Sequence, residues 1–293
     1  MTAPIYLHYD RAALDRQLNL RARWPEHQAY FDRWARESKA VLENRPAHLD
    51  FAYGADPGEK LDLLLARDRG PAQPLLIFIH GGYWQSLDKT DFTYLAPPFL
   101  ERGYAFASVN YSLAPDAAID RMVQQCRNAV MALHRSAGAF NLDPDRMYIC
   151  GHSAGGHLAT ATILTDWRSL DSALPARPLQ AGCSVSGLYE LEPVRLSYQN
   201  EVVKLTPEVV ATVSPLRGLH DPGVPFLCAV GADETDEFLR QQRVFVGEAR
   251  RIGWDVAAME CSGLNHFSVI DAVGDRAHPL FDAVLGLISA TSN

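Results

Sequence analysis

Two glycine-rich turns constrain the fold of this 293-residue chain most strongly. HGGYW at 80–84 follows the apolar run at 75–79, and GHSAGG at 151–156 follows the apolar run at 147–150. The second turn leads into HLATA at 157–161, which is compatible with a helix. A strand, a sharp glycine turn and a helix are the context in which a nucleophilic serine is raised above a sheet. Ser153, at the centre of GHSAG, is therefore the candidate nucleophile.

The residue types around Ser153 fit that chemistry. Glycine at 151 and at 155 permits close backbone approach on both sides of a strained turn, where a Cβ would obstruct it. The HGG turn lies some 70 residues upstream, after its own apolar run, where the second half of an oxyanion hole is expected. We therefore expect the backbone N–H groups of Gly82, Tyr83 and Ala154 to form that hole. A GHSAG segment alone would be explained equally well as a glycine-rich loop.

A serine hydroxyl needs a base within hydrogen-bond reach and an acid that orients the base. The apolar run at 225–230 ends at GADE, so Asp233 and Glu234 compete for the role of the acid. The run at 256–260 is followed by a glycine-containing loop that carries His266. The order serine, acid, histidine is the one required by a hydrolase with a GxSxG turn. The residues alone leave the acid open between positions 233 and 234.

Alternation of buried strands and helix-length segments predicts the fold class. Strands are expected at 75–79, 105–109, 146–150, 181–186, 225–230 and 255–259, with helical segments such as 119–136 and 237–252 between them. This pattern indicates an α/β fold, with a mostly parallel central sheet and helices on both faces. Weaker strand patterns at 48–53 and 60–66 would add an antiparallel edge.

The chain resembles the kynurenine formamidase (arylformamidase) branch of the α/β-hydrolases, close to esterases of the HGG type. The resemblance rests on HGGYW at 80–84, NYSLAP at 110–115, GHSAGGHLA at 151–159, SGLYEL at 186–191 and ETDEF at 234–238. In that family the acid is an Asp three residues after the strand-end glycine. That position is Glu234 here, a departure that adds a methylene, and the resemblance favours Glu234 over Asp233.

The resemblance also implies a substrate in which a formyl group is carried by an aromatic amine. Trp84, Tyr189 and Phe267 would then lie near the serine as substrate-binding residues, although each is explained equally well by core packing. A kynurenine-type substrate carries a carboxylate, for which Arg195 and Lys204 are candidate partners.

Two segments fall outside the repeating strand–helix pattern. Residues 1–46 hold several aromatic residues among many charges and are expected to form a helical extension packed on the α/β-hydrolase domain at 47–293, where they could also roof the pocket. Residues 188–222 are too long for a simple connection. Because they follow a strand's carboxyl end, we expect a small lid over the catalytic serine.

Composition excludes several other functions. The formal net charge is −8, without a basic tract, which argues against a nucleic-acid partner. No apolar stretch approaches the roughly 20 residues that span a bilayer, and the N-terminus lacks the order of a signal peptide, so a cytoplasmic protein is expected. The five cysteines show no metal-ligand spacing and are expected to be buried thiols. The sequence leaves a homodimer open.

The predicted function is that of a serine hydrolase that cleaves a small-molecule acyl substrate through an acyl-enzyme, without a metal or organic cofactor. Its triad would be Ser153, His266 and Glu234. An arylformamidase-like amidase and a carboxylesterase for short acyl esters remain open, because both use the same triad. A non-catalytic ligand-binding protein on a hydrolase scaffold is the remaining alternative.

Overall fold

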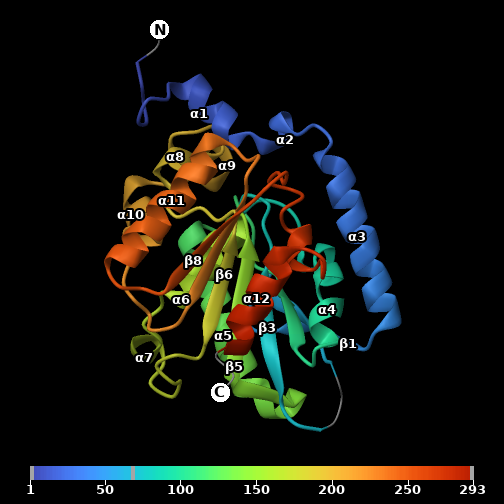
Figure 1. Ribbon diagram of the computed structural model, residues 1–293. Coiled ribbons are helices and arrows are strands. Elements are labelled where there is room, and N and C mark those ends of the chain that lie inside the picture. The colour runs from blue at the N-terminus through green and yellow to red at the C-terminus, as the bar shows by residue number, and fades with distance from the viewer. Residues whose placement is uncertain (1–2, 67–69, 291–293) are drawn as a thin grey trace.

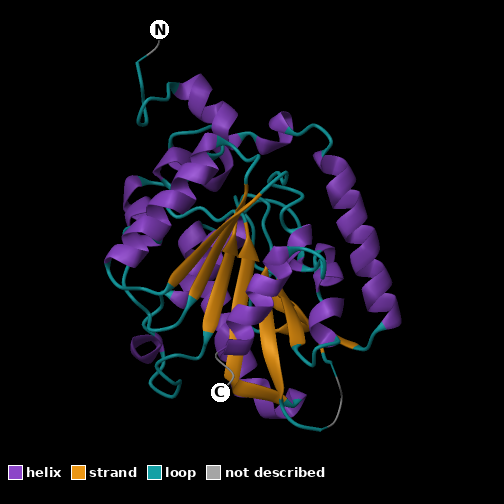
Figure 2. Ribbon diagram, viewed as in Figure 1, coloured by secondary structure: helices purple, strands orange, loops and turns teal. Residues whose placement is uncertain are grey.

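A central eight-stranded sheet dominates the computed structural model, which describes residues 3–66 and 70–290 (Figure 2). The strand order is β1-β2-β4-β3-β5-β6-β7-β8. Strand β2 runs antiparallel to both of its neighbours, and the strands β3 to β8 run parallel to one another. The predicted mostly parallel sheet with an antiparallel edge is confirmed. The strands are β1 (Ala47–Ala52), β2 (Lys60–Leu64), β3 (Gln73–Ile79), β4 (Ala105–Val109), β5 (Leu142–His152), β6 (Ala181–Val185), β7 (Phe226–Gly231) and β8 (Val256–Cys261).

Helices cover both faces of the sheet, with α12 in front of it and α5 and α6 behind it (Figure 1). The α-helices are α1 (Arg11–Leu18), α2 (Leu20–Arg23), α3 (His27–Asn44), α4 (Pro97–Leu100), α5 (Ile119–Ser136), α6 (Ala154–Ile163), α7 (Trp167–Leu170), α8 (Glu192–Arg195), α9 (Asn200–Val203), α10 (Pro207–Val213), α11 (Asp236–Arg251) and α12 (Pro279–Ala290). Short 3₁₀ helices are η1 (Lys89–Asp91), η2 (Thr93–Leu95), η3 (Ala137–Phe140) and η4 (Asp271–Val273). Within the described residues, no helix combines the length and the apolar character that crossing a bilayer requires.

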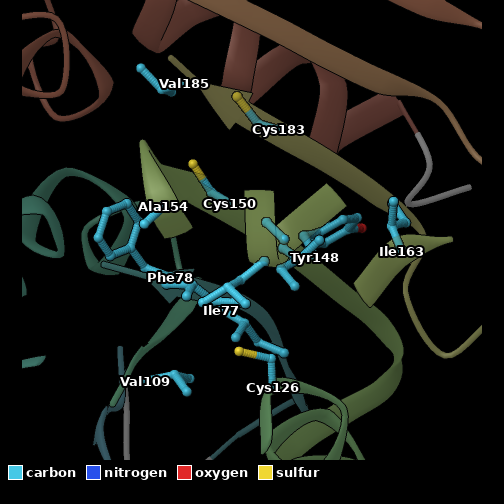
Figure 3. Close-up of a cluster of buried hydrophobic side chains, with 14 of the residues drawn as sticks. Ile77, Phe78, Val109, Cys126, Tyr148, Cys150, Ala154, Ile163, Cys183 and Val185 are labelled. Atoms are coloured by element: carbon cyan, nitrogen blue, oxygen red, sulfur yellow. The ribbon is translucent and has the colours of Figure 1, made fainter. Parts of the chain in front are cut away.

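The hydrophobic core extends over both faces of the sheet, and β3 and β5 lie in its middle. Every residue of β3 is buried, as expected for a strand covered on both faces. Figure 3 shows Ile77 and Phe78 of β3 in this cluster with Tyr148 and Cys150 of β5. All five cysteines are free and buried, as predicted. The core thus fixes β3 and β5, whose carboxyl ends carry the two glycine-rich turns.

The N-terminal helices lie over the edge of the sheet where the strands end. In Figure 1, α1 and α2 cross above the sheet and α3 runs down one side of the molecule. Helix α3 packs against η1 and η2, and α1 packs against α11. The segment 188–222 forms α8, α9 and α10, and α10 packs against α5 on the flank of the sheet. The end of the sheet that holds the glycine-rich turns is therefore covered chiefly from the N-terminal side.

Candidate active site

The turn between β5 and α6 holds Ser153 in an unusual backbone conformation. Its φ is 57° and its ψ is −120°, a region that non-glycine residues rarely adopt. The Ser153 N–H donates to the carbonyl of Val185 on β6 at 2.8 Å, which fixes the turn to the neighbouring strand. A Cβ on Gly155 would lie 2.0 Å from the carbonyl oxygen of Ile79, so only glycine permits this approach of α6 to β3. Backbone strain of this kind is concentrated at functional sites.

A hydrogen-bonded chain links Ser153 to two further buried side chains. The Oγ of Ser153 lies 2.9 Å from Nε2 of His266, and Nδ1 of His266 lies 2.7 Å from Oε2 of Glu234. The loop after β8 supplies the histidine, and the turn after β7 supplies the glutamate. All three side chains are at most 5% exposed. The arrangement has the geometry of a nucleophile, a base and an orienting acid.

Glu234 is held from both sides, whereas its neighbour Asp233 is exposed. The Oε1 atom of Glu234 accepts from the backbone N–H of Gly231 at 2.9 Å and from the hydroxyl of Ser186. Ser186 comes directly after β6 and has a positive φ of 52°. The longer side chain of a glutamate is thus held in place, because Oε1 is anchored while Oε2 bonds to His266. The structure brings position 234, and not 233, to the histidine.

The HGGYW turn places three successive residues at positive φ: Gly82 at 105°, Tyr83 at 50° and Trp84 at 58°. Within the described part of the chain, the N–H groups of Gly82, Tyr83 and Ala154 donate no hydrogen bond. Gly82 and Tyr83 line the same cavity as Ser153, and Ala154 is the first residue of α6. Free donors beside a nucleophile are one requirement of an oxyanion hole.

A small cavity of about 30 Å³ lies over Ser153. Its wall includes Phe267, as the sequence predicted, together with Tyr83 and Leu87 of the HGGYW segment and its continuation. The rest of the roof comes from the N-terminal segment, through Phe31 and Trp34, two of the aromatic residues of the segment 1–46, and through Leu20 and Arg21, which the sequence did not single out. The N-terminal extension therefore closes the site, and the expected lid at 188–222 does not line this cavity.

A second cavity of about 330 Å³ adjoins the first. The two share Leu20, Arg21 and Tyr83, and the second is otherwise lined by polar side chains: Asn19, Gln85, Ser86, Tyr198 and Gln199. Tyr198 and Gln199 belong to the segment 188–222, which thus borders the second cavity rather than covering the serine.

Two of the aromatic residues proposed for substrate binding lie outside both cavities. Trp84 is fully buried, and its indole N–H donates to Nδ1 of His157 at 3.3 Å. Tyr189 stacks on Phe245 with ring centroids 4.2 Å apart, and its hydroxyl donates to Ser184. Packing in the core explains both residues.

The two cations proposed as partners of a substrate carboxylate also lie outside both cavities. Arg195 is held by Glu192 through bonds of 2.8 and 2.6 Å. Lys204 is exposed at the end of α9. Their place in a lid, inferred from chain order, therefore did not bring them to the serine.

One carboxylate fastens the roof to the body of the protein. Asp271, five residues after His266, accepts from the indole N–H of Trp34 and the hydroxyl of Tyr94, both at 2.9 Å, and from the guanidinium of Arg33. These donors come from α3 and η2, while Asp271 opens η4. Helix α3 is therefore held directly against the segment that follows the histidine.

A second buried histidine, His152, contacts the backbone of His266. Burial lowers the pKa of His152 well below its ordinary value, so the ring is neutral. Its Nε2 donates to the carbonyl of His266 at 2.9 Å, and its buried Nδ1 has no partner among the described residues. The bond fixes the backbone of the loop that carries His266.

No group of three His, Cys, Asp or Glu side chains suited to a metal ion occurs within residues 3–66 and 70–290.

Comparison with known proteins agrees with this geometry. The BD-FAE family model matches residues 61–186. Kynurenine formamidase from Danio rerio is 34% identical over 245 residues, which cover 82% of this chain and 81% of the relative, and that from Salmo salar is 31% identical with the same coverage. A solved structure from Silicibacter sp. TM1040, provisionally described as a thioesterase, superposes with a TM-score of 0.80 and 29% identity over 94% of this chain and 98% of its own. The chain belongs to the kynurenine formamidase family of α/β-hydrolases.

Proposed function

We propose that the protein hydrolyses amides of small acyl groups, with an N-formylated aromatic amine of the N-formylkynurenine type as its substrate. The observation that carries the proposal is the chain Ser153–His266–Glu234 beneath a cavity of about 30 Å³. A cavity of that size holds about two water molecules. A cavity this small, with Trp34 and Phe267 in its lining, favours a formyl group over a longer acyl chain.

The reaction follows from the positions of the side chains. Ser153 attacks the carbonyl carbon while Nε2 of His266 takes the hydroxyl proton, and the negative oxygen is held by the free N–H groups of Gly82, Tyr83 and Ala154. Glu234 accepts from Nδ1 and stabilises the imidazolium. The proton then passes from Nε2 to the leaving nitrogen, the C–N bond breaks, and the amine departs. Water repeats the sequence on the formyl-enzyme and releases formate.

The two cavities divide the substrate between them. The acyl group occupies the small cavity, and the aromatic amine extends past Tyr83 into the larger one, whose 330 Å³ lies within the range of small-molecule sites. The names of the similar kynurenine formamidases support the choice of a formamide as the substrate.

Steady-state hydrolysis of N-formylkynurenine tests the proposal, with its N-acetyl and N-butyryl analogues beside it and Ser153→Ala as the blank. We expect turnover to fall in the order formyl, acetyl, butyryl. An inactive Ser153→Ala protein beside an active parent excludes the non-catalytic alternative. Turnover of p-nitrophenyl acetate without turnover of any formamide would refute the proposal and make the protein a carboxylesterase.

A further inference from the structure

We infer that Arg21 binds an anionic group, a carboxylate, on the leaving-group side of the substrate. This inference rests on the proposed function, because it places the leaving group in the cavity of about 330 Å³. Arg21 lies on α2 and lines both that cavity and the small one over Ser153. A substrate that spans the two cavities must therefore pass this side chain.

The charge around the two cavities favours an anion. Among the described residues that line them, none is Asp or Glu, and Arg21 is the one Lys or Arg. The chain as a whole carries a formal net charge of −8, so this cationic site stands apart from the overall balance. A cleft lined by charge of one sign concentrates ligands of the opposite sign.

The guanidinium of Arg21 is positioned but not neutralised. It donates to Oγ of Ser86 at 2.8 Å and lies over the ring of Phe31, 5.5 Å from its centroid, and no described carboxylate pairs with it. Asp15, on the preceding helix, is taken by the guanidinium of Arg11 and by the backbone N–H of Tyr198. An arginine fixed by one hydrogen bond and one aromatic face keeps further N–H donors for a carboxylate.

The polar side chains beside Arg21 are already ordered by one another. Gln85 donates to Gln199 at 2.6 Å, and Gln199 donates to the hydroxyl of Tyr198 at 2.8 Å. These amides and hydroxyls form a neutral polar wall. The preference for a negatively charged group over a neutral one therefore depends on Arg21. The inferred ligand class is an aromatic amine whose side chain ends in a carboxylate.

Matched substrates separate recognition of the carboxylate from catalysis. The first pair is N-formylkynurenine and its α-carboxamide, in which the carboxylate is replaced by a neutral amide. The second pair is 4-acetoxybenzoate, which carries a free carboxylate, and methyl 4-acetoxybenzoate, in which that carboxylate is esterified. For wild-type protein we expect kcat/KM to favour the anionic member of each pair. Arg21→Gln should lower this preference about 10- to 100-fold, mainly through KM, as expected for one hydrogen bond to a charged group. Arg21→Lys should retain part of it.

Two controls separate binding from a structural role. Arg23→Gln removes the other arginine of α2, which lies over Trp24 and lines neither cavity, and should leave the preference unchanged. Ser86→Ala removes the bond that positions Arg21 but keeps the charge, and should lower the preference less than Arg21→Gln does.

The outcomes distinguish this inference from the proposed function. Equal losses on anionic and neutral substrates in Arg21→Gln, or an unchanged preference, would overturn the inference while formamide hydrolysis stands. If wild-type protein cleaves neither formamide, the proposed function fails, and the ester pair still tests Arg21 by the same ratio. A wild-type protein without preference in either pair would also overturn the inference.

Discussion

Replacing Glu234 by Gln should disable the site through the tautomer of His266. The two oxygens of Glu234 have different partners: Oε1 faces the N–H of Gly231 and the hydroxyl of Ser186, while Oε2 faces Nδ1 of His266. The N–H of Gly231 can only donate, so the amide oxygen of a glutamine must take the Oε1 position. Its NH₂ group then faces Nδ1 and donates to it. The imidazole is left with its proton on Nε2.

An imidazole protonated on Nε2 cannot accept the proton of Ser153, which lies 2.9 Å from that atom. By analogy with the asparagine variant of the serine-protease triad acid, we expect kcat to fall by a factor on the order of 10³ to 10⁴. This corresponds to roughly 4 to 5.5 kcal/mol in the barrier. The melting temperature should change little, because the glutamine keeps the shape and all three hydrogen bonds, the one to His266 with its direction reversed.

The assay is turnover of the best acyl substrate by Glu234→Gln, together with ¹⁵N NMR of the His266 ring. The matched control is Asp233→Asn, an exposed neighbour, which should remain within about twofold of the parent, as usual for surface changes. Retention of more than a tenth of the activity, or a ring protonated on Nδ1, would refute the argument. A larger loss in Asp233→Asn would transfer the role of the acid to that residue.

Three further predictions concern the supports of the site. Trp84→Phe removes the indole N–H that reaches His157 and leaves a small cavity at a fully buried position, and should lower the free energy of unfolding in urea by about 2 to 3 kcal/mol with kcat within twofold. Gly155→Ala places a Cβ 2.0 Å from the carbonyl of Ile79, and the displaced turn should cost about 10² in kcat; an active variant would contradict this account of the turn. Burial lowers the pKa of His157 to about 4, so the unfolded chain takes up this proton first as pH falls below about 6.5. The contribution of His157 to the free energy of unfolding should therefore decrease by about 2.5 kcal/mol from pH 6.5 to pH 4, and His157→Gln should remove this part of the slope in urea titrations.

The fold was readable from sequence because each parallel strand is a short apolar run that ends at a turn. The start of β5 is an exception. We expected the strand at 146–150, whereas it begins at Leu142, and its pairing with β3 shifts register between Gln73 and Leu75. The residues added at this end, LDPD at 142–145, are polar apart from Leu142 and contain a proline, so no hydrophobic pattern marks them as a strand.

The residues that line the pocket were harder to predict from the sequence than the three side chains beneath it. Chain order after successive strands was enough to single out Ser153 and His266, because parallel strands deliver their carboxyl ends to one edge. An aromatic residue near that edge gives no sign of which way it points: Phe267 lines the cavity, whereas Tyr189 stacks in the core. Arg21 was missed because it reaches the site through packing of a helix far away in the sequence.

The hydrogen bonds of Asp271 have a mechanical consequence. Helix α3 can lift from the cavity only by breaking the bonds from Arg33 and Trp34 or by pulling η4 with it. Because η4 begins five residues after His266, a displaced α3 that keeps these bonds also pulls on the loop that positions the base. A protein whose entrance had opened at α3 would therefore lose the alignment of its proton acceptor, so an open but fully aligned state is disfavoured. Closure of the cavity and readiness for proton transfer are coupled through a single carboxylate.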